Sequence, residues 1–159
     1  MNCVLVNVVV QTQLLSEKEI DLRVLARDLP NVVYNPGRFS GMVWKHKGIG
    51  GCCLLFTNGK MIINGFDSIS ECRLGTRHYA LLLQKKTRGG HLRRIKIVTM
   101  TVVADIERKL CLEEMAVALK GHYESELFNA LTLRKGKIHF TFFQSGKIVV
   151  TGLKNLNDI

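Results

Sequence analysis

The chain contains reactive side chains, but their spacing does not match a catalytic or metal-binding motif. Five histidines and five cysteines show no spacing typical of zinc ligands, and no C-x-x-C pair occurs. The segment Gly48-x-Gly50-Gly51 is too short for a dinucleotide-binding loop. Asp105 and Glu107 are the nearest approach to a carboxylate pair, and we expect them to end a strand. We therefore expect no catalytic residue, no metal and no cofactor, and predict that the protein is not an enzyme.

The charge of the chain favours a polyanionic partner. Lys and Arg number 23 against 13 Asp and Glu, which gives a formal net charge of +10. Such an excess is typical of proteins that bind nucleic acid or an anionic membrane surface. A basic soluble protein without such a partner is the alternative on charge alone.

The cysteines and the apolar segments indicate the compartment. An odd number of cysteines without paired spacing favours a reduced compartment, where the thiols act as small buried hydrophobic groups. The opening MNCVLVNVVV has neither the basic start nor the cleavage site of a signal peptide. No stretch approaches the ~20 apolar residues of a membrane helix. We expect a soluble intracellular protein with no membrane partner and no small-molecule substrate.

The sequence contains an internal repeat. FTNGKMIINGF at 56–66 aligns with FQSGKIVVTGL at 143–153, and YNPGRFSGMVWK at 34–45 aligns with YESELFNALTLR at 123–134. Two matches in the same order and at nearly the same spacing indicate a duplicated unit. We predict a first repeat at 1–90 and a second at 91–159, joined at Gly89-Gly90 in one continuous domain.

Periodicity and turn signals predict similar elements in both repeats. In the first repeat, Ser16 and Glu19 form a capping box that predicts a helix ending near Leu29, and Ser68 and Glu71 predict a second helix to about Lys86. Its expected strands lie at 3–10, 39–46, 52–56 and 60–65. In the second repeat we expect strands at 95–104, 127–134, 138–143 and 147–152, and a helix at 112–119.

The predicted strands are apolar on both faces. In the first, Val4, Val6, Val8 and Val10 lie on one face, and Leu5 and Val9 flank Asn7 on the other. Short hairpin connections require antiparallel pairing, and the predicted helices suffice to cover only one side of the sheet. The sequence therefore predicts a sheet whose second face binds a partner.

Several segments, taken together, resemble the TATA-binding protein family from Leu5 to Lys154. They are NVV at 7–9, YNPGRF at 34–39, LLFTNGKMIINGF at 54–66, RHYALLLQK at 77–85, YESELF at 123–128 and FFQSGKIVVTG at 142–152. The resemblance implies an α+β saddle, a curved antiparallel sheet made of two pseudo-symmetric repeats with helices on the convex face. It also implies a general transcription initiation factor that binds the DNA minor groove, bends the duplex and nucleates preinitiation-complex assembly at A/T-rich, TATA-like promoters.

The resemblance implies roles for particular residues. The wedges that kink DNA map onto Phe39, Phe56, Phe128 and Phe143. The minor-groove base contacts map onto Asn7, Val9, Leu54, Asn64, Thr99 and Thr151. The phosphate contacts map onto Arg38, Lys45, Lys60, Arg134 and Lys147. A contact with a transcription factor IIB-like partner maps onto Glu124, Glu126 and Leu127.

The implied partners are double-stranded A/T-rich promoter DNA, transcription factor IIB-like and IIA-like factors, and the RNA polymerase machinery. The implied location is the nucleus, or the cytoplasm for an archaeal or viral protein.

The chain departs from the family pattern at three places. Asn64 stands where the family has Thr, and Thr99 stands where it has Asn, so the hydrogen-bonding groups are exchanged. Ser125 replaces a Pro in YESELF. The final helix of the second repeat is missing, because KNLNDI follows Gly152. These departures leave open an alternative in which the same fold serves as an architectural or protein-interaction module with weak or nonspecific DNA binding. A second alternative is the substrate-binding module of a nucleic-acid enzyme, although the chain has no room for a catalytic part.

Overall fold

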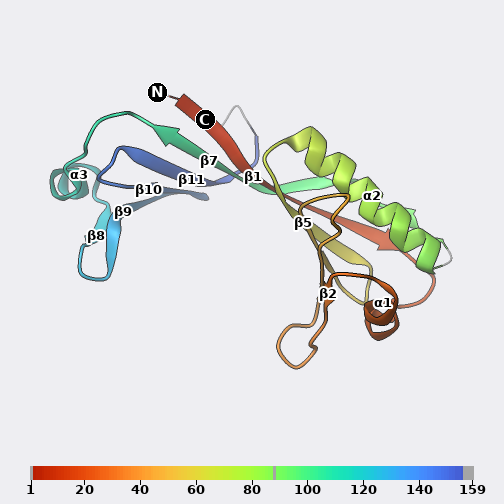
Figure 1. Cartoon of the computed structure of the whole chain (residues 1–159). Helices are drawn as coiled ribbons and strands as arrows, with labels where there is room; N and C mark the ends of the chain where they lie inside the picture. The colour runs from red at the N-terminus through yellow and green to blue at the C-terminus, as the bar shows by residue number, and fades with distance from the viewer. Residues whose placement is uncertain (1, 88, 156–159) are drawn as a thin grey trace. The chain divides into compact units, whose positions relative to one another are not determined.

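The structure, a computed structural model, describes residues 2–87 and 89–155 (Figure 1). The chain forms two compact units. We call Asn7–Val98 the N-terminal unit, and Met1–Val6 together with Thr99–Ile159 the C-terminal unit. None of the described helices is long and apolar enough to cross a membrane.

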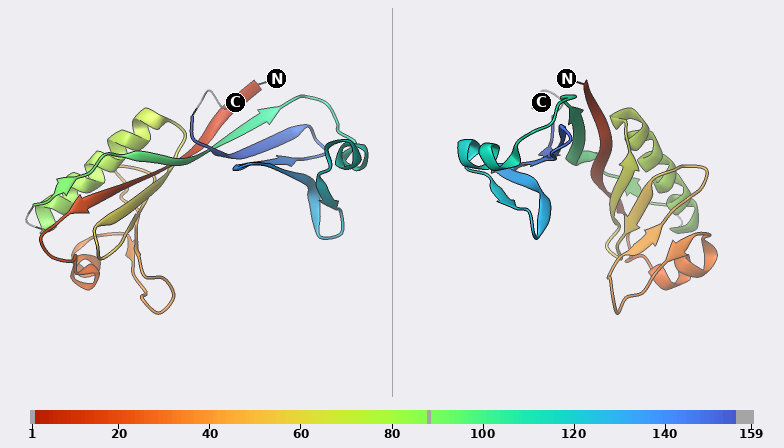
Figure 2. Two further views of the ribbon diagram at one scale, coloured as in Figure 1. Left: turned by 180° about the vertical axis from the view of Figure 1, so that it is seen from behind. Right: turned by 60° about the vertical axis from the view of Figure 1, so that its left-hand side comes forward.

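The N-terminal unit is an antiparallel sheet with the strand order β2-β3-β4-β5-β1, and β6 pairs with the end of β1. The bounds are Asn2–Leu15 for β1, Val32–Val33 for β2, Met42–Trp44 for β3, Cys52–Leu55 for β4, Lys60–Phe66 for β5 and His91–Leu92 for β6. The helix α2 (Ile69–Thr87) lies along one face of this sheet (Figures 1 and 2). The predicted cap of α2 is confirmed, because the Ser68 hydroxyl oxygen accepts a hydrogen bond from the Glu71 N–H at 3.4 Å.

The core of the N-terminal unit lies between α2 and the sheet. The strand residues Met42, Trp44, Cys53, Leu55, Met61 and Ile63 are fully buried. From α2, Tyr79 packs edge-to-face on Trp44 with ring centroids 4.9 Å apart. The Tyr79 hydroxyl accepts a hydrogen bond from the His46 N–H and donates one to the Gly50 carbonyl, each at 3.0 Å. These bonds tie α2 to the connection between β3 and β4. Because α2 packs on this side, the opposite face of the sheet has no covering helix.

The first helix differs from its prediction. The helix α1 covers only Leu22–Asp28, and its N-cap is Asp21, whose carboxylate accepts from the N–H groups of Arg23 and Val24. The predicted capping box at Ser16 and Glu19 is therefore wrong. The physical reason is that β1 continues to Leu15, where it pairs with β6. The segment after β1 then runs back to the turn between β4 and β5, where the Ile20 N–H donates to the Thr57 carbonyl at 2.8 Å, before α1 begins.

The strand expected at 39–46 is shorter, because β3 begins only at Met42. The carbonyl of Asn35 accepts hydrogen bonds from the N–H groups of both Arg38 and Phe39. Phe39 is therefore the last residue of a turn that begins at Asn35, and it precedes β3.

The C-terminal unit repeats this order as β7-β11-β10-β9-β8. β1 and β7 are divided between the units, at Val6 and at Thr99. The bounds are Lys96–Asp105 for β7, Leu112–Leu119 for α3, His122–Glu124 for β8, Phe128–Lys135 for β9, Ile138–Phe142 for β10 and Lys147–Leu153 for β11. All the pairings described within this unit are antiparallel. The prediction of a helix at 112–119 is confirmed, and α3 packs beside β8 and β9.

One face of the C-terminal sheet is only partly covered. Met100, Val102, Leu131 and Leu153 are buried, whereas the stacked pair Phe140 and Phe142 is half-buried, as are Ile148 and Val150. Between Lys147 and Asn155 the structure describes β11 and no helix. Residues 156–159 of the KNLNDI segment lie outside the described residues.

Candidate nucleic-acid interface

The N-terminal unit has a sheet face that no helix covers. The strand register places Val43 opposite Leu54, Leu54 opposite Ile62, and Ile62 opposite Gln11. These residues alternate with the buried core residues and therefore point to the other side of the sheet. Val43, Leu54 and Ile62 are half-buried apolar residues, and Gln11 is exposed. We call this side the open face of the N-terminal unit.

A pair of phenylalanine rings stands at the open face. Phe39 and Phe56 meet edge-to-face with ring centroids 5.7 Å apart, and Phe39 is 41% exposed. Gly41 makes room for them, since a Cβ there would lie 2.7 Å from a carbon of the Phe39 ring and 3.0 Å from one of the Phe56 ring. The Lys60 Nζ lies 5.9 Å from the Phe56 centroid, which places a cation beside the pair.

The C-terminal unit carries the same arrangement. Phe128 and Phe143 meet edge-to-face at 6.4 Å, and Phe128 is 52% exposed. The register places Val103 opposite Val149, Val149 opposite Thr141, and Thr141 opposite Thr132, with all four half-buried. By strand alternation, this open face of the C-terminal unit is opposite the face that holds Phe140 and Phe142. The structure thus brings the four predicted wedge residues together as two pairs, one in each unit.

The predicted base-contact residues Asn7 and Thr99 hold equivalent positions. The Asn7 Oδ1 accepts a hydrogen bond from the Gly65 N–H at 2.9 Å, and the Thr99 Oγ1 accepts one from the Gly152 N–H at 3.1 Å. Both glycines lie at irregularities in the pairing and have φ of +86° and +91°, a conformation that favours glycine. With its oxygen engaged, Asn7 retains two amide hydrogens for an acceptor, whereas Thr99 retains one hydroxyl hydrogen.

The other predicted base-contact residues are Val9, Leu54, Asn64 and Thr151, and all four are half-buried. Asn64 pairs with Cys52 across β5 and β4, and Thr151 lies between Thr101 and His139. They are therefore strand residues with part of their surface available to a ligand.

The predicted phosphate-contact residues are accessible. Arg38, Lys45, Arg134 and Lys147 are exposed, and Lys60 is half-buried. The Arg134 Nε donates to the Gly136 carbonyl at 3.0 Å, which holds its guanidinium near the turn after β9. Across residues 2–87 and 89–155, the one ion pair joins His122 to Glu124 at 3.3 Å. No carboxylate in that part of the chain forms an ion pair with a predicted phosphate-contact residue.

The predicted protein-partner residues occupy the turn between β8 and β9. The Leu127 N–H donates to the Glu124 carbonyl at 3.0 Å and closes the turn. Leu127 is 80% exposed, and Glu126 is exposed beside it. An apolar side chain held this far into solvent beside a carboxylate can dock into a pocket of another protein.

The five cysteine thiols differ in burial, and Cys52 is half-buried. Burial raises the pKa of the Cys72 thiol to about 11 and the pKa of Cys53 well above its ordinary value. These two thiols are buried, as predicted, and are poor nucleophiles. Cys3 and Cys111 are exposed, so the expectation that the cysteines are buried is wrong for them. They lie on the first residues of β1 and at the cap of α3, where no element covers them.

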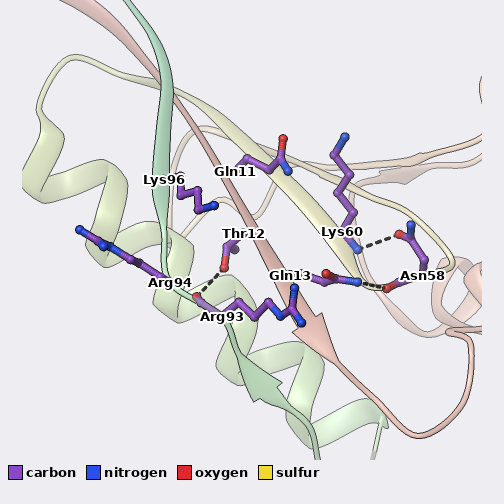
Figure 3. Close-up of a pocket in the computed structure, with 8 residues that line it drawn as sticks. All are labelled: Gln11, Thr12, Gln13, Asn58, Lys60, Arg93, Arg94 and Lys96. Atoms are coloured by element: carbon purple, nitrogen blue, oxygen red, sulfur yellow. Dashed lines mark hydrogen bonds between the residues drawn. The ribbon is translucent and has the colours of Figure 1, made fainter. Parts of the chain in front are cut away.

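Sequence reasoning missed one basic cluster. Arg93, Arg94 and Lys96 line a pocket in the N-terminal unit together with Lys60 (Figure 3). The run LRRIK at 92–96 was a visible signal of concentrated charge. Its place beside β1 depends on contacts between distant parts of the chain, which the sequence alone does not show.

Two units of matching strand order, each with an open face, an aromatic pair and exposed cations, define an α+β protein class built by internal duplication. The sequence model of the family described as "Transcription factor TFIID (or TATA-binding protein, TBP)" matches residues 2–86 and 94–159. The chain therefore belongs to the TATA-binding protein family.

Individual relatives agree with this assignment. The chain is similar to the TATA-box-binding proteins of Candida albicans, at 34% identity over 144 residues, and Saccharomyces cerevisiae, at 33% over 144 residues. Each match covers 88% of this chain and 60% of the relative. The TATA box-binding protein-like 2 of Rattus norvegicus is 34% identical over 145 residues, which cover 89% of this chain and 42% of that protein. The chain thus spans about half the length of these curated relatives.

A solved structure confirms the fold class. The structure titled "Methanococcus jannaschii TBP" matches with a TM-score of 0.84 at 30% sequence identity, and the match covers 99% of this chain and 91% of that one. The predicted α+β fold of the TATA-binding protein family is therefore confirmed.

Proposed function

We propose that this protein is a general transcription initiation factor that binds and bends A·T-rich promoter DNA through the minor groove, and that it is not an enzyme. The observation that carries the proposal is the phenylalanine pair on the open face of each unit, in which one ring is exposed and the other half-buried. A solvated aromatic pair is unfavourable without a ligand, and base faces exposed at an opened step are a suitable apolar partner.

The bending mechanism assigns separate tasks to the rings and to the sheet. Insertion of the rings unstacks a base step at a cost of a few kcal/mol, and contact between the rings and the bases offsets this cost. The half-buried apolar residues around Leu54 and Val149 then replace water along the groove floor. Each aromatic pair is accordingly assigned to one kink.

The preference for A·T over G·C pairs is assigned to the polar residues that lie among the apolar residues of the open faces. The minor groove of A·T pairs presents only the acceptors adenine N3 and thymine O2, whereas G·C pairs add an amino group. Asn7 can donate its amide hydrogens to such acceptors while Gly65 holds its oxygen. Thr99, Asn64 and Thr151 supply the remaining polar contacts, and Val9 and Leu54 exclude the guanine amino group.

Phosphate contacts and protein partners complete the proposal. Arg38, Lys45, Lys60, Arg134 and Lys147 position the duplex through its backbone without reading sequence. The turn with Glu124, Glu126 and Leu127 docks a transcription factor IIB-like partner. A IIA-like factor and the RNA polymerase machinery join the assembly, in the nucleus of a eukaryote or in the cytoplasm for an archaeal or viral protein.

The test is circular-permutation bend analysis on TATA-containing and G·C-rich duplexes. We expect a bent complex on the first and weaker binding to the second. Phe56→Ala and Phe143→Ala should each remove bend angle to a greater extent than affinity, because the phosphate contacts remain. Phe140→Ala is the matched control, since Phe140 lies on the other face of the C-terminal sheet.

Equal and unbent binding to both duplexes would contradict this function. It would favour the second candidate, an architectural or protein-interaction module with nonspecific DNA binding. One observation favours that candidate: the half-buried apolar face of the C-terminal sheet around Phe140 and Phe142, a surface suited to a protein partner.

A further inference from the structure

The N-terminal unit contains a pocket whose charged lining is entirely basic. It has a volume of about 260 Å³ and is lined by Gln11, Thr12, Gln13, Asn58, Lys60, Arg93, Arg94 and Lys96 (Figure 3). Four of these eight side chains are cations, and the others carry amide or hydroxyl groups that donate hydrogen bonds. Such a lining suits an oxyanion and disfavours a cation or an apolar ligand.

Hydrogen bonds between distant parts of the chain fix the walls of the pocket. The Thr12 hydroxyl donates to the Arg93 carbonyl at 2.7 Å, and the Arg93 N–H donates to the Gln13 carbonyl at 2.8 Å. The Gln13 Nε2 donates to the Asn58 carbonyl at 3.0 Å, and the Asn58 Oδ1 accepts from the Lys60 N–H at 3.0 Å. The backbone that carries the cations is thereby held before any ligand arrives, which lowers the entropic cost of binding.

Among the described residues, no carboxylate forms an ion pair with the cations of the pocket. The ion pair described above, His122–Glu124, belongs to the other unit, and it is the one ion pair of residues 2–87 and 89–155. A neighbouring pocket of about 380 Å³ adds Arg73 and Arg77 and shares Arg93 and Arg94. In Figure 3 the Arg93 side chain extends toward Gln13, whereas Arg94 points to the other side. The two arginines therefore serve two adjacent anion-attracting pockets.

The pocket continues the open face of the N-terminal unit. Lys60 lines the pocket and also lies beside the Phe56 ring, and Gln11 pairs with Ile62 in the row that includes Leu54. An extended polyanion on the open face can therefore reach this pocket. The neighbouring pocket adjoins Arg73 and Arg77 of α2 on the covered side of the sheet, and it is not part of this surface. Guanidinium groups match phosphate in geometry as well as in charge.

We propose that Arg93, Arg94 and Lys96, together with Lys60, form an additional contact site for the phosphodiester backbone of bound DNA. The inference rests on the proposed function. The site adds affinity and salt dependence, and it does not contribute to the bend, because it holds the backbone and not the base steps.

The experiment compares R93Q/R94Q with the control R23Q/R27Q, which removes the same charge from exposed positions of α1 outside both pockets. Affinity for a TATA-containing duplex is measured against salt concentration, and bend angle is measured on the same complexes. We expect R93Q/R94Q to reduce the slope of log K against log salt by about 1.8, at ~0.9 for each lost phosphate contact. The control should keep the wild-type slope, and both variants should keep the wild-type bend and melting temperature.

Three outcomes would overturn the site. Equal slopes for the two variants, with wild-type bending intact, would overturn the site alone. A bend angle that falls with the slope would place Arg93 and Arg94 in the kinking machinery and contradict a backbone contact. Poly-glutamate binding is measured on the same proteins, and wild-type binding that R93Q/R94Q loses at an unchanged DNA slope would show a surface for an acidic protein instead. A wild-type protein that neither binds nor bends either duplex would refute the proposed function itself.

Discussion

At the scale of single residues, the two units differ most at one equivalent position, which is Asn7 in the N-terminal unit and Thr99 in the C-terminal unit. The side-chain oxygens of Asn7 and Thr99 each accept a hydrogen bond from the N–H of an equivalent glycine. The geometry of the anchoring bond is thus retained although the side chain differs. What changes is the number of hydrogens left for a ligand, two on Asn7 and one on Thr99.

Thr99→Asn should therefore increase the preference for A·T-rich DNA. One added hydrogen bond to a groove acceptor contributes about 1 kcal/mol, or roughly a fivefold change in affinity. The measurement is the ratio of affinities for TATA-containing and G·C-rich duplexes in wild type and variant. His78→Asn, at an exposed position of α2 on the covered side of the sheet, is the control. An unchanged ratio in Thr99→Asn would show that this position does not read the groove.

At the scale of elements, the packing of α2 on the sheet depends on a narrow space between Gly51 and Gly75 that holds the Phe66 ring; we call this space the Phe66 slot. Phe66 ends β5 and is 9% exposed. A Cβ at Gly75 would lie 2.5 Å from one side of its ring, and a Cβ at Gly51 would lie 2.3 Å from another atom of the same ring. The ring cannot move away from one glycine without approaching other close neighbours. The two glycines therefore set the distance between helix and sheet.

Gly75→Val should destabilise the N-terminal unit by about 1–3 kcal/mol, the usual cost of overpacking a filled site. The gain in helix propensity over glycine is less than ~1 kcal/mol and does not offset this cost. The measurement is the free energy of unfolding by denaturant. His78→Val introduces the same side chain at an exposed position of α2 and should change it by less than about 0.5 kcal/mol. Equal changes in the free energy of unfolding for the two substitutions would show that the Phe66 slot does not limit the packing of α2.

Elements with a local signal could be predicted from the sequence, and those set by distant contacts could not. The helix α3 and the cap of α2 follow from periodicity and from Ser68. The start of α1 could not be predicted, because it depends on the pairing of Leu14 with Leu92 across the sheet. The same reason explains the site: the phenylalanines follow from repeated motifs, whereas the position of Arg93 depends on a bond to Thr12, 81 residues away.

At the scale of the whole molecule, the net charge of +10 should be visible as salt dependence. Five phosphate contacts predict a slope of log K against log salt of about −4.5, and the three further cations of the proposed site make it about −7. Titration of a TATA-containing duplex at several salt concentrations measures the slope directly. A slope near zero would show that the positive charge serves another purpose than DNA binding.

The position of Trp44 gives this protein a built-in optical probe. Trp44 is the single tryptophan of the chain, is fully buried, and its indole N–H has no hydrogen-bond partner among the described residues. An indole in so dry a setting emits at short wavelength, and its fluorescence shifts to the red once water reaches it. The emission therefore reports the melting of one half of the protein and is silent about the other. Because the ring lies on the α2 side of the sheet, a ligand on the opposite side leaves that signal unperturbed.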